Sequence, residues 1–423
     1  MREMKDSGIE WIGRIPETWE VKRIKHLFTI ISGATPGNDA DNWDGDIFWI
    51  TPADYKTKDK YVSQGKRNLT KKGFDSCSTC LIPAGNVIFS KRAPIGTVAI
   101  NTKELCTNQG CLSCISKFEL SNAFYYYVLS VGTEYFELLG TGTTFKEISA
   151  NTFANCKLPF PSLQIQERIV EFLDAKCAEI DALTSDIQAQ IDTLEQYKRS
   201  IITEAVTKGL DPDAEMRDSG IPWIGEIPKN WRVDKLKFHL MRYEPRNPGN
   251  KPVLSLYRDF GVIPKDTRDD NHNVTSEDTS NYKYVRPGNL VINKMKAWQG
   301  SVAVSDYEGI VSPAYFVYKF TDNSYHKRYF HYLLRSCYKD EFMRLSSGIR
   351  VSQWDLPSAE LDNIQVIIPP ISEQCCIAKF LDARCTEIED TITMKKAQLT
   401  TLANYKNSLI FEYVTGKKEV PAS

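Results

Sequence analysis

Two long stretches of the chain place apolar residues three or four positions apart, with polar residues between them. They cover residues 161–209 and 369–416. This spacing is typical of a helix with one apolar seam, as in a coiled coil. We therefore predict two helices of about forty residues, each roughly 60 Å long at 1.5 Å per residue. The predicted seam residues are Ile180, Leu183, Ile187, Ile191 and Leu194 in the first helix and Ile388, Ile392, Leu399 and Leu402 in the second.

Each predicted helix has a proline at its start and a glycine at its end. Pro161 and Pro369 precede the two stretches, and Gly209 and Gly416 close them, which is ordinary helix punctuation. The seam of an isolated helix of this length would face water, so we expect the two helices to pair with each other. If a pseudo-two-fold axis relates them, the pair is antiparallel, with one globular part at each end of a spacer.

The chain contains the same structural unit twice. The opening segment Asp6–Pro16 returns as Asp218–Pro228, and the closing triplet Phe172–Asp174 returns as Phe380–Asp382. Between these ends the two copies keep the same order of features but are less similar. Matching ends around divergent middles are expected when two copies do the same job on two different targets. Neutral drift after a duplication would give the same pattern.

The divergent middles, residues 19–159 and 231–368, read as mixed α/β. Short β-rich runs bounded by Gly, Pro or Asn, such as Val87–Phe89, predict strands. Near 123–139 and 327–345 the spacing of aromatic and leucine residues becomes helical. We expect these aromatic side chains to form core rather than platforms for stacking bases.

The predicted fold class is therefore α/β in the α+β sense. It consists of two mixed α/β domains joined by a pair of long antiparallel coiled-coil helices, with an internal pseudo-two-fold repeat. The predicted boundaries are 1–160 for the first domain, 161–209 for the first helix, 210–368 for the second domain, 369–416 for the second helix and 417–423 for a tail.

The composition is that of a globular protein with balanced charge. The 423 residues include 53 Lys and Arg against 54 Asp and Glu, and this length suits two sizeable domains with connecting elements. The chain has neither a run of about eighteen apolar residues nor an apolar signal segment at its start, so we expect a cytoplasmic protein without membrane contact. Its 11 cysteines are interpreted as reduced core thiols.

Basic residues gather in a few segments of the divergent middles, where they are candidates for polyanion contacts. A solvated lysine-rich loop is an equally good interpretation of each. The candidate residues are Lys66, Arg67, Lys91, Arg92, Thr143, Thr144 and Lys146 in the first copy and Lys294, Lys296, Gln299, Arg350 and Gln353 in the second.

The chain lacks the usual catalytic signatures. It has no Gly-x-x-x-x-Gly-Lys-Ser/Thr loop, and the glycine turn at 140–145 lacks the third glycine of a dinucleotide fingerprint. The Asn/Asp-Pro-Pro-aromatic tetrapeptide of amino-methyltransferases is also missing. Five histidines without ligand spacing argue against a metallohydrolase.

One cysteine pattern invites a metal interpretation. Cys77 and Cys80 share a Cys-x-x-Cys spacing with Cys111 and Cys114. Cys111 and Cys114 lie in a predicted strand, where residues i and i+3 face opposite sides. We therefore favour core thiols over a zinc site and predict no metal site.

The chain resembles the specificity subunit of type I restriction-modification systems over nearly its whole length. The resemblance rests on the doubled Asp-Ser-Gly-Ile-x-Trp-Ile-Gly-x-Ile-Pro opening followed by Trp19 or Trp231, on the Pro-x-Gly block that begins at Pro83, and on the closing Pro-Pro-x-x-Glu-Gln before Phe-Leu-Asp. The first copy departs from the closing motif, because Ile165 stands where the second copy has a glutamate. Glu167 could take over the role of that glutamate.

The resemblance implies a non-catalytic reader of double-stranded DNA, with two target-recognition domains that each read one half of a split sequence. The candidate residues of the two copies would then be its DNA-binding residues, where arginine suits guanine edges and glutamine or asparagine suits adenine edges. It also implies that the helices set the gap between the halves and dock methyltransferase subunits, which restriction subunits join. S-adenosylmethionine, ATP and magnesium are then expected in those partner subunits, and no cofactor is expected on this chain. Two alternatives stay open: a coiled-coil scaffold that organises proteins without DNA specificity, and a single-chain DNA methyltransferase or nuclease.

Overall fold

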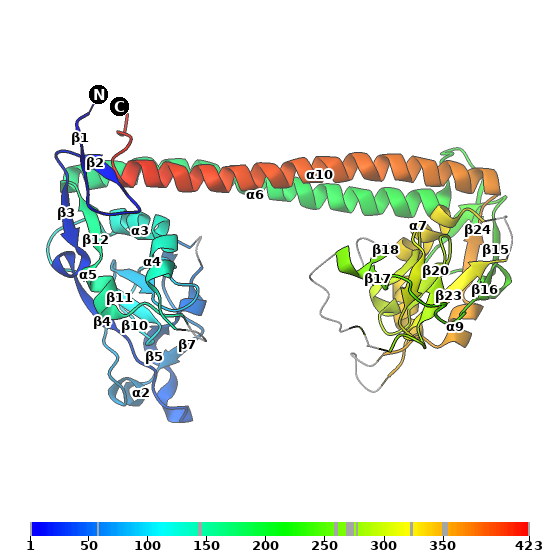
Figure 1. Ribbon diagram of the computed structural model, residues 1–423, viewed down its shortest axis with the longest axis horizontal. Coiled ribbons are helices and arrows are strands. Elements are labelled where there is room, and N and C mark those ends of the chain that lie inside the picture. The colour runs from blue at the N-terminus through cyan, green and yellow to red at the C-terminus, as the bar shows by residue number, and fades with distance from the viewer. Residues whose placement is uncertain are drawn as a thin grey trace. The chain divides into compact units, whose positions relative to one another are not determined.

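The computed structural model describes residues 2–56, 59–142, 146–257, 261–267, 275, 278–321, 325–348 and 354–421. The chain divides into two compact units. The first comprises Met1–Ile187 and Ala397–Ser423, and the second comprises Gln188–Lys396. Because both boundaries fall inside the long helices, each unit contains one domain, one end of its own helix and one end of the other (Figure 1).

The two long helices are α6 (Leu163–Lys208, 46 residues) and α10 (Ile371–Val414, 44 residues). In the second unit, Lys198 of α6 pairs with Glu389 of α10, while the earlier residue Gln190 accepts a hydrogen bond from the later residue Lys395. The two helix segments of this unit therefore run antiparallel, as predicted. In the first unit, the ends of the same helices are joined by Lys406, whose Nζ lies 2.6 Å from Oδ1 of Asp181.

The predicted seam is largely confirmed but wrong at Leu183, whose side chain is 52% exposed. After Ile180 the inward position falls at Thr184, which is half-buried and donates a 2.8 Å hydrogen bond from Oγ1 to the carbonyl of Ile180. Because the hydroxyl is satisfied within the helix, a threonine can lie at the seam. The remaining seam residues are buried (Ile180, Ile191, Ile388 and Ile392) or half-buried (Ile187, Leu194, Leu399 and Leu402).

The first domain is built around a five-stranded sheet in the order β4-β11-β8-β9-β6. Its two faces pack into different cores. Cys114 belongs to the core shared with the long helices, whereas Cys111 belongs to a separate core on the other face, as the alternation of a strand requires. The strands are β4 (Phe28–Ser32), β6 (Tyr61–Val62), β8 (Val87–Ser90), β9 (Val98–Asn101) and β11 (Cys111–Ser116).

The second domain repeats this sheet with four strands in the order β16-β23-β20-β21. The middle pairing is antiparallel in both copies, with β8 or β20 next to β11 or β23. The strand runs predicted from the sequence are therefore confirmed. The strands are β16 (Leu240–Arg242), β20 (Leu290–Asn293), β21 (Val302–Val304) and β23 (Tyr315–Phe320).

The predicted aromatic helices are present, but each is two helices rather than one. Gly132 separates the first pair and Tyr338 the second. Their large side chains are buried, including Phe124 and Phe330, so the prediction of core aromatics is confirmed. The helices are α3 (Asn122–Val131), α4 (Thr133–Leu139) and α5 (Ala150–Asn155) in the first copy and α7 (Lys327–Cys337), α8 (Lys339–Leu345) and α9 (Ser358–Asn363) in the second.

The repeated opening motif forms a tight hairpin in each copy. Its two glycines have positive φ angles, 61° at Gly8 and 71° at Gly13, which side chains disfavour. Asp6 accepts a 2.9 Å hydrogen bond from the amide of Gly8. The strands of the two hairpins are β1 (Met4–Asp6) with β2 (Arg14–Pro16), and β13 (Met216–Asp218) with β14 (Glu226–Pro228). The strand after each hairpin pairs with the strand before the long helix: β3 (Glu20–Arg23) with β12 (Lys157–Phe160), and β15 (Arg232–Lys235) with β24 (Gln365–Ile368).

The glutamine of the closing motif joins the domain to the long helix. Gln166 is buried, accepts a hydrogen bond from the amide of Ser121 at the start of α3, and donates one to the carbonyl of Pro161. Gln374 makes the same two contacts with His326 and Pro369 in the second copy. One buried amide therefore ties the first domain helix to the start of the long helix.

The two copies differ in the strands that they add outside the core sheet. The first copy inserts a three-stranded sheet around a core that contains Trp43, Trp49 and Leu69. The second copy inserts two strand pairs instead. The inserted strands are β5 (Trp43–Ile50), β7 (Arg67–Leu69) and β10 (Cys106–Thr107) against β17 (Leu254–Tyr257), β18 (Gly261–Pro264), β19 (Lys283–Val285) and β22 (Gly309–Val311).

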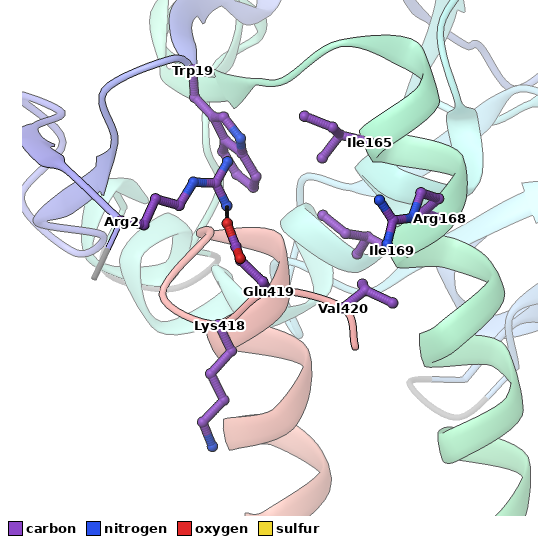
Figure 2. A pocket seen from close by; sticks show the side chains of 8 residues that line it. All are labelled: Arg2, Trp19, Ile165, Arg168, Ile169, Lys418, Glu419 and Val420. Atoms are coloured by element: carbon purple, nitrogen blue, oxygen red, sulfur yellow. Dashed lines mark ion pairs between the residues drawn. The ribbon is translucent and has the colours of Figure 1, made fainter. Parts of the chain in front are cut away.

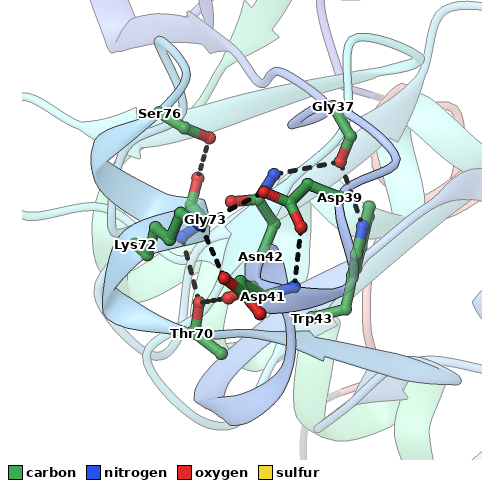
Figure 3. A network of polar contacts seen from close by, with 9 residues as sticks. All are labelled: Gly37, Asp39, Asp41, Asn42, Trp43, Thr70, Lys72, Gly73 and Ser76. Carbon is green, nitrogen blue, oxygen red and sulfur yellow. Dashed lines mark hydrogen bonds and ion pairs between the residues drawn. The ribbon is translucent and has the colours of Figure 1, made fainter.

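A polar network holds the insert of the first copy together (Figure 3). Lys72, on the short helix α2 (Lys71–Asp75), pairs with Asp39 at 3.1 Å and with Asp41 at 2.8 Å. Thr70 caps the helix by accepting from the amide of Gly73. A side chain at Gly73 would collide with the carbonyl of Asn42, so the glycine permits this close approach.

A hydrogen-bonded carboxylate on each long helix attaches the domain to that helix. Asp382 of α10 accepts hydrogen bonds from Arg328, at 2.6 Å, and from the hydroxyl of Tyr332, at 2.7 Å. In the first copy, Asp174 accepts from Tyr127 and Lys60. The tyrosine comes from the equivalent helix, α3 or α7, in each copy. The cation comes from α7 in the second copy and from the segment before β6 in the first.

We predict that Asp382→Asn lowers the free energy of unfolding of the second unit by about 1 kcal/mol near pH 7. Partial burial favours the neutral acid, but the bonds from Arg328 and Tyr332 outweigh it, and the pKa of Asp382 is lowered. A lowered folded-state pKa gives stability that is present above the unfolded pKa of about 4 and is lost as the pH falls through the folded value.

Urea unfolding at pH 7 and pH 3 tests this. The difference between wild type and Asp382→Asn should shrink at pH 3. Asp390→Asn, an exposed carboxylate on the same helix, is the matched control and should change little at either pH. An equal loss at both pH values for Asp382→Asn would contradict the electrostatic explanation.

Candidate nucleic-acid interface

In the first domain, two loops that are far apart in the sequence meet. The loop after β8 carries Lys91 and Arg92, and the segment before α5 carries Glu147. The carbonyl of Lys91 accepts a 3.0 Å hydrogen bond from the amide of Ile148, and its amide donates to the carbonyl of Gly110. The backbone thus brings the basic loop after β8 beside the segment that carries Glu147 and Ile148.

Glu147 joins these loops through its side chain. Its carboxylate lies 2.8 Å from Nζ of Lys91 and 2.7 Å from Nε of Arg92. Burial acts to raise the pKa of Glu147, but the hydrogen bonds from the two cations outweigh it, and the pKa is lowered. The carboxylate is therefore charged at neutral pH and holds both cations in place.

The second domain builds the same junction from different residues. The carbonyl of Lys294 accepts a 3.0 Å hydrogen bond from the amide of Leu356, and its amide donates to Ala314. Nζ of Lys294 lies 3.2 Å from the carboxylate of Asp355. We call the Lys91–Glu147 and Lys294–Asp355 junctions the loop clamps. The clamp recurs although the surrounding sequences differ, so it belongs to the shared frame.

The candidate cations fall into two groups. Lys91, Arg92 and Lys294 have partners in the loop clamps. Lys66, Lys146 and Lys296 are exposed, and in the described part of the chain they have no ion pair. These three lysines can contact a polyanion without breaking an internal bond. Next to Lys66 in the sequence, the guanidinium carbon of Arg67 lies 3.9 Å from the ring centroid of Trp43. In the second copy, Gln299 is half-buried in the short turn η5 (Ala297–Gln299).

The second clamp also carries apolar groups that the first does not. Met295 is 37% exposed beside Lys296. The rings of Trp298 and Trp354 meet edge to face with centroids 5.6 Å apart, and Nε1 of Trp298 donates to the carbonyl of Met295. The clamped loops of the two domains therefore present different surfaces on the same backbone arrangement.

Four of the predicted residues lie outside the described part of the chain. They are Thr143, Thr144, Arg350 and Gln353. The candidates that sequence reasoning missed are the carboxylates Glu147 and Asp355. Each lies a few residues after a glycine that the two copies share, Gly142 or Gly348, and this shared position was the available signal.

The cysteines do not all lie in the core. Cys111 and Cys114 are buried as predicted, but Cys80 and Cys376 are exposed, so the interpretation of every cysteine as a core thiol was wrong. Burial raises the pKa of the Cys111 thiol to about 12. Across the described ranges, no group of three or more His, Cys, Asp or Glu residues is placed to hold a metal ion. Nor does any described helix have the length and apolarity needed to cross a membrane.

We predict that Glu147→Gln loosens the first loop clamp. Losing the charge on Glu147 weakens its bonds to Lys91 and Arg92, at a cost of about 1 kcal/mol. The amide of Ile148 should then exchange its hydrogen roughly fivefold faster, as measured by hydrogen exchange of peptides that span residues 146–150. Glu134→Gln, at an exposed position of α4, is the control. Unchanged exchange at Ile148 would show that the backbone alone holds the loops.

Comparison with known proteins places the repeat in a family. A sequence model described as type I restriction modification DNA specificity domain matches residues 16–193 and 235–401, one segment in each copy. The chain is 32% identical over 257 residues to the type I restriction enzyme MjaIX specificity subunit of Methanocaldococcus jannaschii, an alignment that covers 60% of this chain and 58% of that protein. The chain thus spans little more than half the length of the MjaIX subunit.

A second relative aligns over nearly its full length. It is the putative type I restriction enzyme MjaX specificity subunit of the same organism, 24% identical over 448 residues, with 97% of this chain and 96% of that protein covered.

Two solved structures have a similar fold. One is a chain from a study of complex assembly and conformational transition in the type I R-M system, with a TM-score of 0.72, 16% identity, and 96% of this chain and 99% of that chain covered. The other is the HsdS subunit from Thermoanaerobacter tengcongensis, with a TM-score of 0.53, 18% identity and coverage of 96% and 98%. At these identities the likeness concerns the fold alone. It confirms the predicted pair of mixed α/β domains with long helices. Because the family model matches most of both copies, the chain belongs to the family of type I restriction modification DNA specificity domains.

Proposed function

We propose that this chain is the DNA-reading subunit of a type I restriction-modification complex, and that each domain reads one half of a two-part target. The observation that carries this proposal is the recurrence of the loop clamp. Lys91–Glu147 and Lys294–Asp355 fix the same pair of loops in both domains, while the residues that those loops expose differ. A shared frame with different exposed groups suits two readers of different sequences.

The exposed lysines without an ion pair are candidates for the contacts such a reader needs. We infer that Lys66 and Lys146 in the first domain and Lys296 in the second contact phosphates, which provide affinity. Arg67, Arg92 and Gln299 have the donors and acceptors that read base edges. Lys91 and Lys294 act mainly as internal supports, because their ammonium groups already pair with carboxylates.

The partners follow from the same proposal. The relatives are named as specificity subunits, and we infer that this chain likewise works beside methyltransferase and restriction subunits. S-adenosylmethionine, ATP and magnesium would then be bound by those partners, and this chain would contribute recognition rather than chemistry. The competing proposals are a protein-organising scaffold and a single-chain enzyme. The repeated clamps with exposed cations favour a DNA reader over the scaffold, and the missing catalytic motifs disfavour the enzyme.

We predict that Lys146→Ala and Lys296→Ala act on different halves of the target. If each lysine contacts a phosphate, each variant weakens DNA binding at all sequences and lowers the salt dependence of log K by about one unit. If it contacts a base, the variant no longer selects the base at one position of the corresponding half, a loss of discrimination of about 1–3 kcal/mol. Methylome sequencing of a host that expresses each variant with its methyltransferase, together with binding titrations in salt, distinguishes these outcomes.

Lys229→Ala is the control, because Lys229 is exposed but paired with Glu215 at 2.7 Å. Wild-type methylation and salt dependence in both test variants would rule out these lysines as DNA contacts. A methylated motif that is continuous or perfectly palindromic would contradict the two-reader proposal itself.

We also predict that lengthening the helices changes the gap in the target and leaves the bases unchanged. Four residues would be inserted after Ser185 in α6 and after Thr401 in α10, so that the antiparallel register is kept. The insertion adds about 6 Å of helix, close to two base pairs at 3.4 Å each. Sequencing of methylated sites should show a longer gap between unchanged halves, whereas the pair Ser185→Ala and Thr401→Ala should leave the gap as it is. Altered bases would contradict the role of the helices as a ruler.

A further inference from the structure

The two copies differ in one hydrogen bond at the start of the long helices. In the second copy, Nε1 of the buried Trp231 donates a 2.9 Å hydrogen bond to the carboxylate of Glu373. In the first copy the equivalent tryptophan, Trp19, is 1% exposed. Its Nε1 is buried and has no partner in the described part of the chain. Because a buried donor without a partner is unfavourable, this position calls for an acceptor that the first copy lacks.

The missing acceptor results from a substitution in the closing motif. Ile165 occupies the place of Glu373. Glu167 does not take over the role that the sequence suggested for it, because its side chain is exposed and Nε1 of Trp19 has no partner in the described part of the chain. The first copy therefore keeps the tryptophan donor and has lost the carboxylate.

A cavity of about 290 Å³ lies at this place in the first unit. Figure 2 shows the Trp19 ring above it, with Ile165 and Ile169 of α6 along one wall and Glu419, from the segment after α10, opposite. Glu419 is the only acid among the lining residues, and it pairs with Arg2 at 3.2 Å. Its carboxylate is thus directed to Arg2.

Three cations line this cavity, of which Lys418 pairs with Glu412. The other two occur only in the copy that lacks the glutamate. Arg2 and Arg168 line the cavity, and Arg168 is exposed without an ion pair in the described part of the chain. At the equivalent positions, the second copy has Ala214 and Cys376. The second copy thus has the carboxylate without the two arginines, and the first has the arginines without the carboxylate.

We propose that the cavity at Trp19 binds a carboxylate group supplied from outside the chain. The carboxylate takes the role that Glu373 plays at Trp231: it accepts from Nε1 of Trp19 once the side chain of Ile165 moves aside, and it lies near Arg2 and Arg168. Its source is either a small free carboxylate or an acidic side chain of a bound protein. The site goes beyond DNA recognition and does not depend on it.

The indole N–H resonance of Trp19 in the ¹⁵N-labelled full chain provides the test, with sodium acetate as the probe and sodium chloride at equal ionic strength as the control. Acetate should shift this resonance in a saturable manner and leave that of Trp231 unchanged. Trp19→Phe assigns the signal. Should that variant fail to fold, the signal is the one displaced in Ile165→Glu.

Two variants make the test specific. Ile165→Glu supplies the internal carboxylate, so its Trp19 resonance should resemble that of Trp231 and no longer respond to acetate. Arg168→Gln should weaken acetate binding roughly three- to tenfold, because it removes one charged contact. In the second copy, Glu373→Ile frees the indole of Trp231 without adding arginines, and we expect a much weaker response there.

The affinity distinguishes the two sources. Saturation at micromolar acetate would indicate a free carboxylate, whereas saturation only at tens of millimolar would indicate a side chain held at high local concentration by a bound protein. A folded chain whose Trp19 resonance ignores acetate would overturn the proposal. So would a resonance that already resembles that of Trp231 and reverts in Glu419→Gln, because the chain's own Glu419 would then be the acceptor.

Discussion

The pairing of α6 with α10 is the interaction on which both units depend. In the first unit, the core that contains Trp19 and α3 also contains Leu409 and Val414, from the far end of α10. In the second unit, the core around Trp231 contains Val206, from the far end of α6. Each domain is therefore completed by a helix end that belongs to the other copy. Because burial of apolar surface is the main favourable contribution to folding, neither copy has a full core without the other.

Polar contacts then fix each domain on its helix at a few repeated points. The buried amides of Gln166 and Gln374 join the helix start to the domain, and the carboxylates of Asp174 and Asp382 accept from a tyrosine and a cation. These groups are conserved between the copies, whereas the cation that meets each carboxylate comes from different elements. The attachment thus constrains the carboxylate and leaves the insert free to diverge.

The same separation between frame and variable groups holds at the candidate DNA interface. The loop clamps use a lysine and a carboxylate at matching positions, and an internal pair of this kind fixes the loop backbone without specifying what the loop exposes. Arg92 in the first copy and Met295 in the second lie directly after the clamp lysine. A fold organised in this way can change the groups that its loops expose while it keeps its architecture, because the exposed residues carry little of the internal packing.

The repeat, the long helices, most of their buried positions and the core strands could be predicted from the sequence, because periodicity and turn residues are encoded locally. Which helix positions face inward, as at Thr184 in place of Leu183, and which distant groups meet, as at Lys91 and Glu147, became clear only from the three-dimensional structure. It also showed that Trp19 lacks the acceptor that Trp231 has. Contacts of this kind depend on the paths of loops and on register between segments far apart in the chain, and neither leaves a periodic trace in the sequence.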